Sequence, residues 1–180
     1  MSKASPLRWS HALIKVANME AMVDFYTDLL GFEITNREAM NEQEFVFMSQ
    51  VDTDHHQIAF ISGRPDQPPP PAANHFSFRV GNLAEVKAWF EKLNSDARVE
   101  RVSPVTHGNA WSIYFMDPEQ NGIEIFCDSP WHVAQPAGGK WDPNADDETI
   151  MAETKAKFQD KPEFQPIEEY YARRREALKA

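Results

Sequence analysis

The stretch HGNAWSIYFMDPEQNGIEIFC, from His107 to Cys127, decides the fold that this sequence predicts. Asp117-Pro118 and Asn121-Gly122 are turn signals. The runs WSIYFM and IEIF on either side are rich in the β-branched and aromatic residues that suit a pleated strand. The stretch is therefore expected to form a β-hairpin.

Glu124 is the unusual residue of the second predicted strand. Ile123, Ile125 and Cys127 alternate with it, so the carboxylate faces away from the isoleucines. A buried carboxylate needs a partner such as a metal or an arginine, whereas a carboxylate on the solvated face of an edge strand needs none. The segment alone leaves both interpretations open. Cys127, the single cysteine, is expected to be a small core residue and not a nucleophile.

Length and composition limit the classes of function. A chain of 180 residues with 42% hydrophobic residues can form one sizeable core or two small modules that share one. A formal charge of −10 argues against nucleic acid and anionic membrane surfaces as partners. No apolar run reaches the roughly 20 residues of a membrane span, and the first residues lack the apolar core of a signal peptide. A cytoplasmic location is expected, and a lone cysteine agrees with it.

The first part of the chain has the pattern β-α-β-β-β. Residues 9–16 alternate as a strand does, Asn18 is a helix cap, and a helix is predicted over 19–30 before Gly31 ends it. Three runs typical of strands then begin at Phe32, Glu44 and His56.

The same pattern begins again after a linker over 63–74 that carries four consecutive prolines. The run HFSFRV is a predicted strand, Asn82 is a cap, and LAEVKAWFEKL is a predicted helix. The remaining strands are expected near 98–103, 110–116 and 122–127. The order of elements and the unit length of about 55 residues repeat, so two modules are expected, over about 8–62 and 74–128.

The doubled unit, which starts each time with a histidine-bearing strand and closes with YFMDPEQNGIE, resembles the vicinal oxygen chelate superfamily. That superfamily contains glyoxalases, fosfomycin-resistance enzymes, bleomycin-binding proteins and type I extradiol dioxygenases. The resemblance implies an α+β fold in which two βαβββ modules within 1–128 form a curved mixed sheet around a metal site. Residues 129–180 are expected to be a partly helical extension, with helices in ETIMAETKAKFQ and PIEEYYARRREALK.

His11 and His75 begin the matching strands of the two modules. One histidine at a strand start is more often structural, but two at equivalent places in a repeat, together with Glu124, indicate a metal site. Two imidazoles and one carboxylate leave room on the metal for a bidentate substrate and O2, which suits Fe(II), with Mn(II) as the alternative.

The finer motifs resemble those of extradiol dioxygenases. Tyr114 lies ten residues before Glu124, where that family has an active-site tyrosine, and His56 in DHHQIAF takes the place of the family's acid and base. His107 lies near the place of a further active-site histidine; the alternative is a loop histidine that caps a strand. The resemblance implies an enzyme that opens a catechol ring beside one hydroxyl, with a small aromatic diol and O2 as partners and at least a homodimer as its assembly.

Other functions of the same fold remain open. One is a metal-dependent glyoxalase-like isomerase or a fosfomycin-type thiol transferase, and another is a non-catalytic protein that binds an aromatic ligand. The run HQIAFIS lacks the acid that glyoxalase I members carry there. A phosphonate substrate requires clustered cations, and the motif regions supply only Lys15, Arg64 and Arg79.

Overall fold

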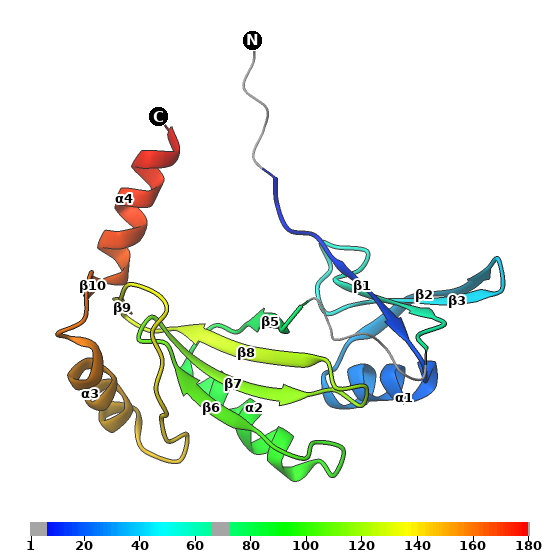
Figure 1. Ribbon diagram of the computed structural model, residues 1–180, viewed down its shortest axis with the longest axis horizontal. Coiled ribbons are helices and arrows are strands. Elements are labelled where there is room, and N and C mark those ends of the chain that lie inside the picture. Colours follow the sequence, from blue (N-terminus) through cyan, green and yellow to red (C-terminus); the bar gives the residue numbers. More distant parts are fainter. Residues whose placement is uncertain (1–6, 66–72, 180) are drawn as a thin grey trace. The chain divides into compact units, whose positions relative to one another are not determined.

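The computed structural model describes residues 7–65 and 73–179. The described part has two compact units, one made of 7–65 with 117–119 and the other of 73–116 with 120–179. Each unit contains one four-stranded mixed sheet with helices (Figure 1). The predicted α+β class with two modules of this kind is confirmed. The four prolines of the predicted linker lie outside the described residues.

The first unit follows the predicted order of elements. Its sheet has the strand order β1-β4-β3-β2, with β1 and β4 parallel and the other pairs antiparallel. The strands are β1 Ala12–Val16, β2 Glu33–Met40, β3 Gln43–Ser49 and β4 Ile58–Ser62. Every residue of β2 is exposed in this chain, as an edge strand allows.

The helical segment of the first unit changes its winding halfway. Asn18 caps α1, Met19–Asp24, by accepting from Ala21 N, and the chain continues as the π-helix η1, Phe25–Leu29. Gly31 then has φ +81°, the left-handed conformation in which glycine is not strained. The sequence predicts one regular helix over residues 19–30. The structure differs in that the second half of this segment is a π-helix.

The turn over residues 117–119 belongs to the first unit. Glu119 Oε1 accepts from the backbone nitrogens of Ala17 and Asn18 at 2.7 and 2.8 Å, and its other oxygen pairs with Arg64 at 3.0 Å. Tyr26 donates to buried Asp117 at 3.3 Å. The Asp117-Pro118 turn is thus held by specific partners, in addition to its local turn propensity.

The second unit repeats the topology of the first, with the strand order β5-β8-β7-β6. Its sheet strands are β5 His75–Arg79, β6 Ser103–Thr106, β7 Ala110–Met116 and β8 Gly122–Asp128. Helix α2, Leu83–Ser95, is capped by Asn82 and packs against β7 and β8. The alternation of β7 and β8 puts Trp111, Ile113 and Cys127 in the core, all at most 3% exposed.

Strand β6 starts later than the predicted 98–103. A local turn occupies the earlier residues: Arg98 N donates to Asp96 Oδ1 at 2.9 Å, and Val99 N donates to Asp96 O. Side chain to backbone bonds of this kind compete with strand pairing. Pro104 fits the strand that results, because β6 is an edge strand and a proline nitrogen has no proton to donate.

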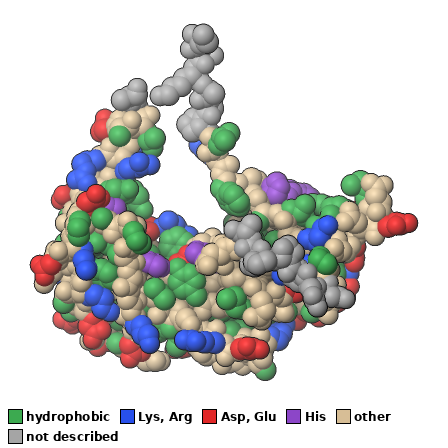
Figure 2. All heavy atoms as spheres, viewed as in Figure 1, with side chains coloured by type: hydrophobic (Ala, Val, Ile, Leu, Met, Phe, Trp, Pro, Cys, Tyr) green, Lys and Arg blue, Asp and Glu red, His purple; other side chains and the backbone are tan. Residues whose placement is uncertain are grey.

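The extension contains the short pair β9 Trp131–His132 and β10 Gln165–Pro166, and the helices α3 Asp147–Phe158 and α4 Ile167–Lys179. Helix α3 is held against the sheet, where Trp111 Nε1 donates to buried Thr154 at 2.9 Å. Helix α4 contacts the unit through its first turn, where Tyr170 stacks on the buried ring of His132. The rest of α4 is exposed, and basic side chains gather over it in Figure 2. No helix in the described ranges meets the length and hydropathy that a bilayer crossing requires.

Candidate active site

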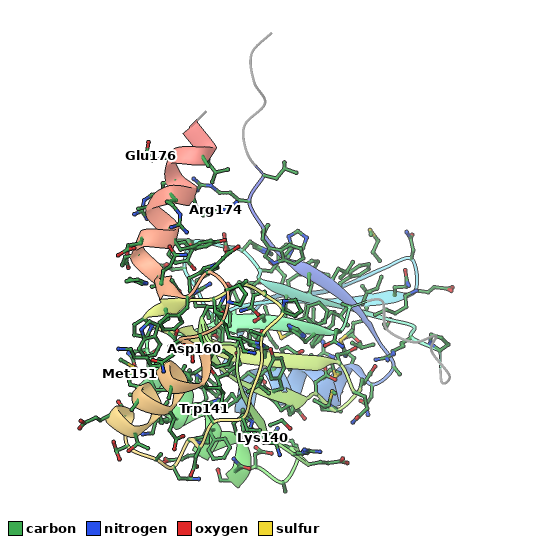
Figure 3. All side chains as sticks on the ribbon, turned by 60° about the vertical axis from the view of Figure 1, so that its left-hand side comes forward. Lys140, Trp141, Met151, Asp160, Arg174 and Glu176 are labelled. Atoms are coloured by element: carbon green, nitrogen blue, oxygen red, sulfur yellow. The ribbon has the colours of Figure 1, made fainter. Side chains whose placement is uncertain are left out.

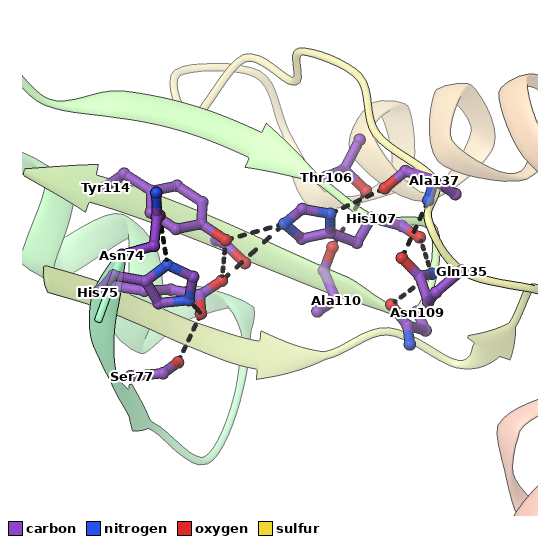
Figure 4. Close-up of polar contacts among 12 residues, drawn as sticks. Asn74, His75, Ser77, Thr106, His107, Asn109, Ala110, Tyr114, Gln135 and Ala137 are labelled. Carbon is purple, nitrogen blue, oxygen red and sulfur yellow. Dashed lines mark hydrogen bonds and ion pairs between the residues drawn. The ribbon is translucent and has the colours of Figure 1, made fainter. Parts of the chain in front are cut away.

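Glu124 is the centre of a polar cluster on the second sheet. Strand β8 is an interior strand, between β5 and β7, and Glu124 is only 8% exposed. Its two neighbours across the strands, Ser77 and Tyr114, each donate to one of its oxygens at 2.5 Å (Figure 4). The interpretation of Glu124 as a solvated residue on an edge strand is therefore wrong.

His75 faces the same carboxylate with a defined tautomer. Its Nδ1 lies 3.0 Å from Asn74 Oδ1, an acceptor, so Nδ1 carries the proton. Nε2 lies 3.3 Å from Glu124 Oε2. In the neutral imidazole, a lone pair and a carboxylate oxygen then face one another, which is favourable only with a proton or a cation between them.

His107 completes a chain of hydrogen bonds. Nδ1 donates to the carbonyl of Ala137 at 2.8 Å, and Nε2 lies 2.9 Å from Tyr114 Oη (Figure 4). The Tyr114 hydroxyl has one proton to donate, and it contacts both Glu124 and His107. When that proton goes to Glu124, the Tyr114 oxygen can act toward Nε2 of His107 only as an acceptor. The interpretation of His107 as a strand-capping loop residue does not account for these two partners.

A segment of the extension, residues 135–141, forms hydrogen bonds with His107 and its neighbour Thr106. Gln135 Nε2 donates to the carbonyl of His107 at 2.9 Å, and Thr106 and Gly139 exchange two backbone hydrogen bonds. Further along, Trp141 donates to the carbonyl of Ser112 at 3.0 Å (Figure 3). Sequence reasoning missed this segment because AQPAGGKW has no periodicity, and its turn-forming composition predicts only a loop.

The electrostatics of the cluster favour an ionised Glu124. Burial raises the pKa of this carboxyl, but the hydroxyls of Ser112, Ser77 and Tyr114 and the charge of His75 lower it below its usual value. Among the residues that the structure describes, the buried Ser112 Oγ has no hydrogen-bond partner, so it acts on Glu124 as a nearby dipole. Burial and the contact with Glu124 raise the pKa of Tyr114 far above its usual value, so the phenol keeps its proton.

The other two predicted site residues, His11 and His56, lie together in the first unit. Their ring centroids are 4.2 Å apart, and the edge of the His56 ring meets Phe47 at 5.1 Å. His55 lies 3.0 Å from His56 through the two Nδ1 atoms and 2.8 Å from Asn36. Burial and the charges of His11 and His55 lower the pKa of His56, so it is neutral at physiological pH.

The donor set of the second unit fits a divalent metal at His75 and Glu124. Donors at about 2.1 Å from a metal and at right angles to one another are about 3 Å apart. The distance of 3.3 Å between His75 Nε2 and Glu124 Oε2 is close to that spacing. Asn74 contacts the other ring nitrogen of His75 and orients the imidazole, as the hydrogen-bond partners of metal-binding histidines do. Within the residues described, no group of three or more His, Cys, Asp or Glu is arranged as a metal site, so the full ligand set stays a prediction.

A pocket of about 240 Å³ opens beside this cluster. His75 and Tyr114 form part of its wall, and the rest consists of Asn74, Arg101, Ser103, Phe115, Met116 and Gly122. Gly122 is required there, because a Cβ at this position would lie 2.4 Å from the carbonyl oxygen of Asn74. The lining contains one formal positive charge and no carboxylate.

Comparison with known proteins agrees with the fold. The family model of the Glyoxalase/Bleomycin resistance protein/Dioxygenase superfamily matches residues 8–125. Among solved structures, a glyoxylase/bleomycin resistance protein/dioxygenase domain from Frankia sp. EAN1pec aligns with TM-score 0.57 at 17% identity, over 71% of this chain and all of its own. The fosfomycin resistance protein FosX of Listeria monocytogenes aligns with TM-score 0.52 at 20% identity, over 71% of this chain and 94% of its own.

Two curated proteins are similar to this chain in sequence. Biphenyl-2,3-diol 1,2-dioxygenase 2 of Rhodococcus globerulus is 23% identical over 153 residues, which are 76% of this chain and 77% of that protein. Metapyrocatechase of Pseudomonas sp. (strain CF600) is 25% identical over 127 residues, 67% of this chain but 39% of that protein. The family model covers well over half of the chain and matches the doubled topology, so this protein belongs to the Glyoxalase/Bleomycin resistance protein/Dioxygenase superfamily.

Proposed function

We propose that this protein is an extradiol ring-cleaving dioxygenase, which uses Fe(II) and O2 to open a catechol-type ring beside one hydroxyl. The observation that carries the proposal is the convergence of His75, Ser77 and Tyr114 on the buried carboxylate of Glu124. Two relatives named biphenyl-2,3-diol 1,2-dioxygenase, which are 23% and 26% identical to this chain, support it.

His75 and Glu124 would hold the metal, and His11 is proposed as the third ligand on the resemblance of its motif. Fe(II), when bound, would supply a site at which a chelating diol and O2 come together, with Mn(II) as the alternative metal. Ser77 and Tyr114 occupy both oxygens of Glu124, so the carboxylate is oriented before any metal binds.

The remaining residues of the proposal handle protons and orientation. Tyr114 keeps its proton and is proposed to redirect this hydrogen bond from Glu124 to an oxygen of the substrate when the substrate binds. His107 lies 2.9 Å from that phenol and supports its orientation. His56, whose lowered pKa leaves it neutral, is proposed to accept a proton from the second hydroxyl and to return one as the ring opens.

The transferase alternative has less support from the arrangement of charges. Arg64 is paired with Glu119, and Arg79 is paired with Asp128. Two of the three cations in the motif regions are thus already paired with carboxylates. The proposed dioxygenase needs no cation of this kind at the metal.

Reconstitution with Fe(II) without oxygen, followed by a panel of catechols in air, tests the proposal. Ring opening is expected as O2 uptake together with a yellow product. Glu124→Gln should lose both, and should bind Fe(II) at least about tenfold more weakly. Glu100→Gln, which changes an exposed carboxylate, is the matched control. A protein that binds Fe(II) but consumes no O2 with any catechol would contradict the proposal.

A further inference from the structure

We propose that the pocket beside Tyr114 binds an anionic substituent on the ring, so that the substrate is a single-ring catechol carrying a carboxylate, with Arg101 as the specificity-determining residue. This inference rests on the proposed function and names the substrate class for it. It concerns Arg101 and Ser103, which have no part in the proposed metal or proton chemistry, together with Asn74, which also orients His75.

The sheet register places these residues next to the site. Ser103 pairs with Tyr114 across β6 and β7, and Tyr114 pairs with Glu124 across β7 and β8. Arg101 precedes Ser103 by two residues, which is about 7 Å of extended chain. Both lie in the wall of the same pocket as His75 and Tyr114. A ring held at the cluster therefore directs a substituent toward Arg101.

The charge of the pocket is opposite to that of the protein. The chain has a formal charge of −10, yet no Asp or Glu is among the described residues that line this pocket. Arg79 pairs with Asp128, and Arg98 pairs with Asp96 at 2.7 Å. Arg101 makes no ion pair with any residue that the structure describes. An unpaired guanidinium in a pocket without acids is suited to a carboxylate, which it can bind through two parallel hydrogen bonds.

Two neutral donors accompany Arg101. The Oδ1 atom of Asn74 is used by His75, so the amide nitrogen remains available to donate. Ser103 places its hydroxyl in the wall, where it makes no hydrogen bond to another described residue. Met116 and Gly122 contribute apolar surface to the wall, which suits the face of a ring. The combination fits a benzoate better than an unsubstituted aromatic hydrocarbon.

The volume of the pocket also indicates the size of the ligand. A cavity of about 150 Å³ is enough for benzene. The pocket of about 240 Å³ therefore has room for one substituted ring. This differs from the two-ring diol in the names of the Rhodococcus globerulus relatives.

The test compares 2,3- and 3,4-dihydroxybenzoate with their neutral methyl esters, on the Fe(II)-loaded protein. The kcat/KM of the preferred acid should exceed that of its ester by about tenfold or more, the effect of one well-placed charged pair. Arg101→Gln should remove the preference for the acid and leave the ester unchanged. Arg101→Lys should keep part of the preference, and Arg98→Gln, a change at a paired arginine, should keep all of it.

An ester that reacts as fast as its acid in the unaltered protein would overturn the inference, and so would a preference that survives in Arg101→Gln. If none of the four compounds is opened, the proposed function fails separately. Calorimetric titration of the metal-loaded protein with the same acids and esters then decides about the pocket. Acid binding that weakens about tenfold in Arg101→Gln supports the anion site, and equal binding of acid and ester overturns it.

Discussion

The Tyr114 hydroxyl donates to Glu124 Oε1 at 2.5 Å and lies 2.9 Å from Nε2 of His107. The two contacts join a buried carboxylate to a histidine that is itself anchored on the backbone of Ala137. One phenol therefore connects the proposed metal ligand with the extension of the chain.

Tyr114→Phe should reduce kcat for catechol cleavage by about 100-fold, since a donor aimed at the reacting oxygen is typically worth that much. The affinity for Fe(II) should change by no more than a few fold, because Ser77 still orients Glu124. Steady-state kinetics and metal titration measure the two effects. Tyr171→Phe on α4 is the matched control, and a kcat near that of the unaltered protein would rule out a role for the phenol.

Gly122→Ala should disrupt the contact between β5 and β8. The new Cβ would lie 2.4 Å from Asn74 O and 3.2 Å from His75 Cβ, and the backbone oxygen cannot move away without shifting the strand. We expect a loss of about 2 kcal/mol in the free energy of unfolding, as for other overpacked sites, and weaker Fe(II) binding. Gly138→Ala meets nothing within 4 Å and should change neither quantity. Urea denaturation measures stability, and equal values for the two variants would argue against this close approach.

Gln135 should act on the reaction through His107. Gln135→Glu keeps the acceptor for Ala137 N but removes the donor to the His107 carbonyl, and it places a negative charge beside carbonyl oxygens. It should lower kcat as much as Gln135→Ala does. In a protein that already carries His107→Ala, neither change at Gln135 should lower kcat further. The double-mutant cycle should therefore give a coupling energy of about 1 kcal/mol or more between Gln135 and His107. Additive losses would show instead that Gln135 only stabilises the fold.

Cys127 should be unreactive in the folded protein. Burial, together with the charges of Asp128 and Glu85, raises the pKa of its thiol to about 12. The thiolate is therefore scarce at about pH 8, and a disulfide reagent should label this cysteine only after denaturation. Rapid labelling of the native protein at that pH would contradict the burial of Cys127.

The same shift determines a dependence of stability on pH. The unfolded thiol ionises near pH 8.5, and the folded thiol ionises only near 12. Its contribution to stability is complete below the unfolded value and is lost as the pH rises from about 9 toward 12. Cys127→Ala should therefore lose less stability over this range than the unaltered protein does, in parallel urea titrations.

Much of the fold follows from the sequence by itself, because its signals are local. The alternation of WSIYFM and IEIF, the caps at Asn18 and Asn82 and the glycine at Gly31 all depend on neighbours within a few residues. The predicted start of β6 was wrong because two local signals compete there. The turn at Asp96 and strand pairing both suit these residues, and strand propensity alone does not show which one forms. The repeated order of elements then predicts the two modules.

Only the tertiary structure decided how the chemistry is assembled in the second unit. Sequence reasoning selected His75, Tyr114 and Glu124, but their contacts depend on strand register and on β8 being an interior strand. The support of His107 by the segment around Gln135 joins residues about 30 positions apart, and the Arg101 pocket joins residues of four strands. Neither leaves a periodic pattern in the sequence. Contacts between distant residues are determined by packing, whereas turns, caps and alternation are determined by the local chain.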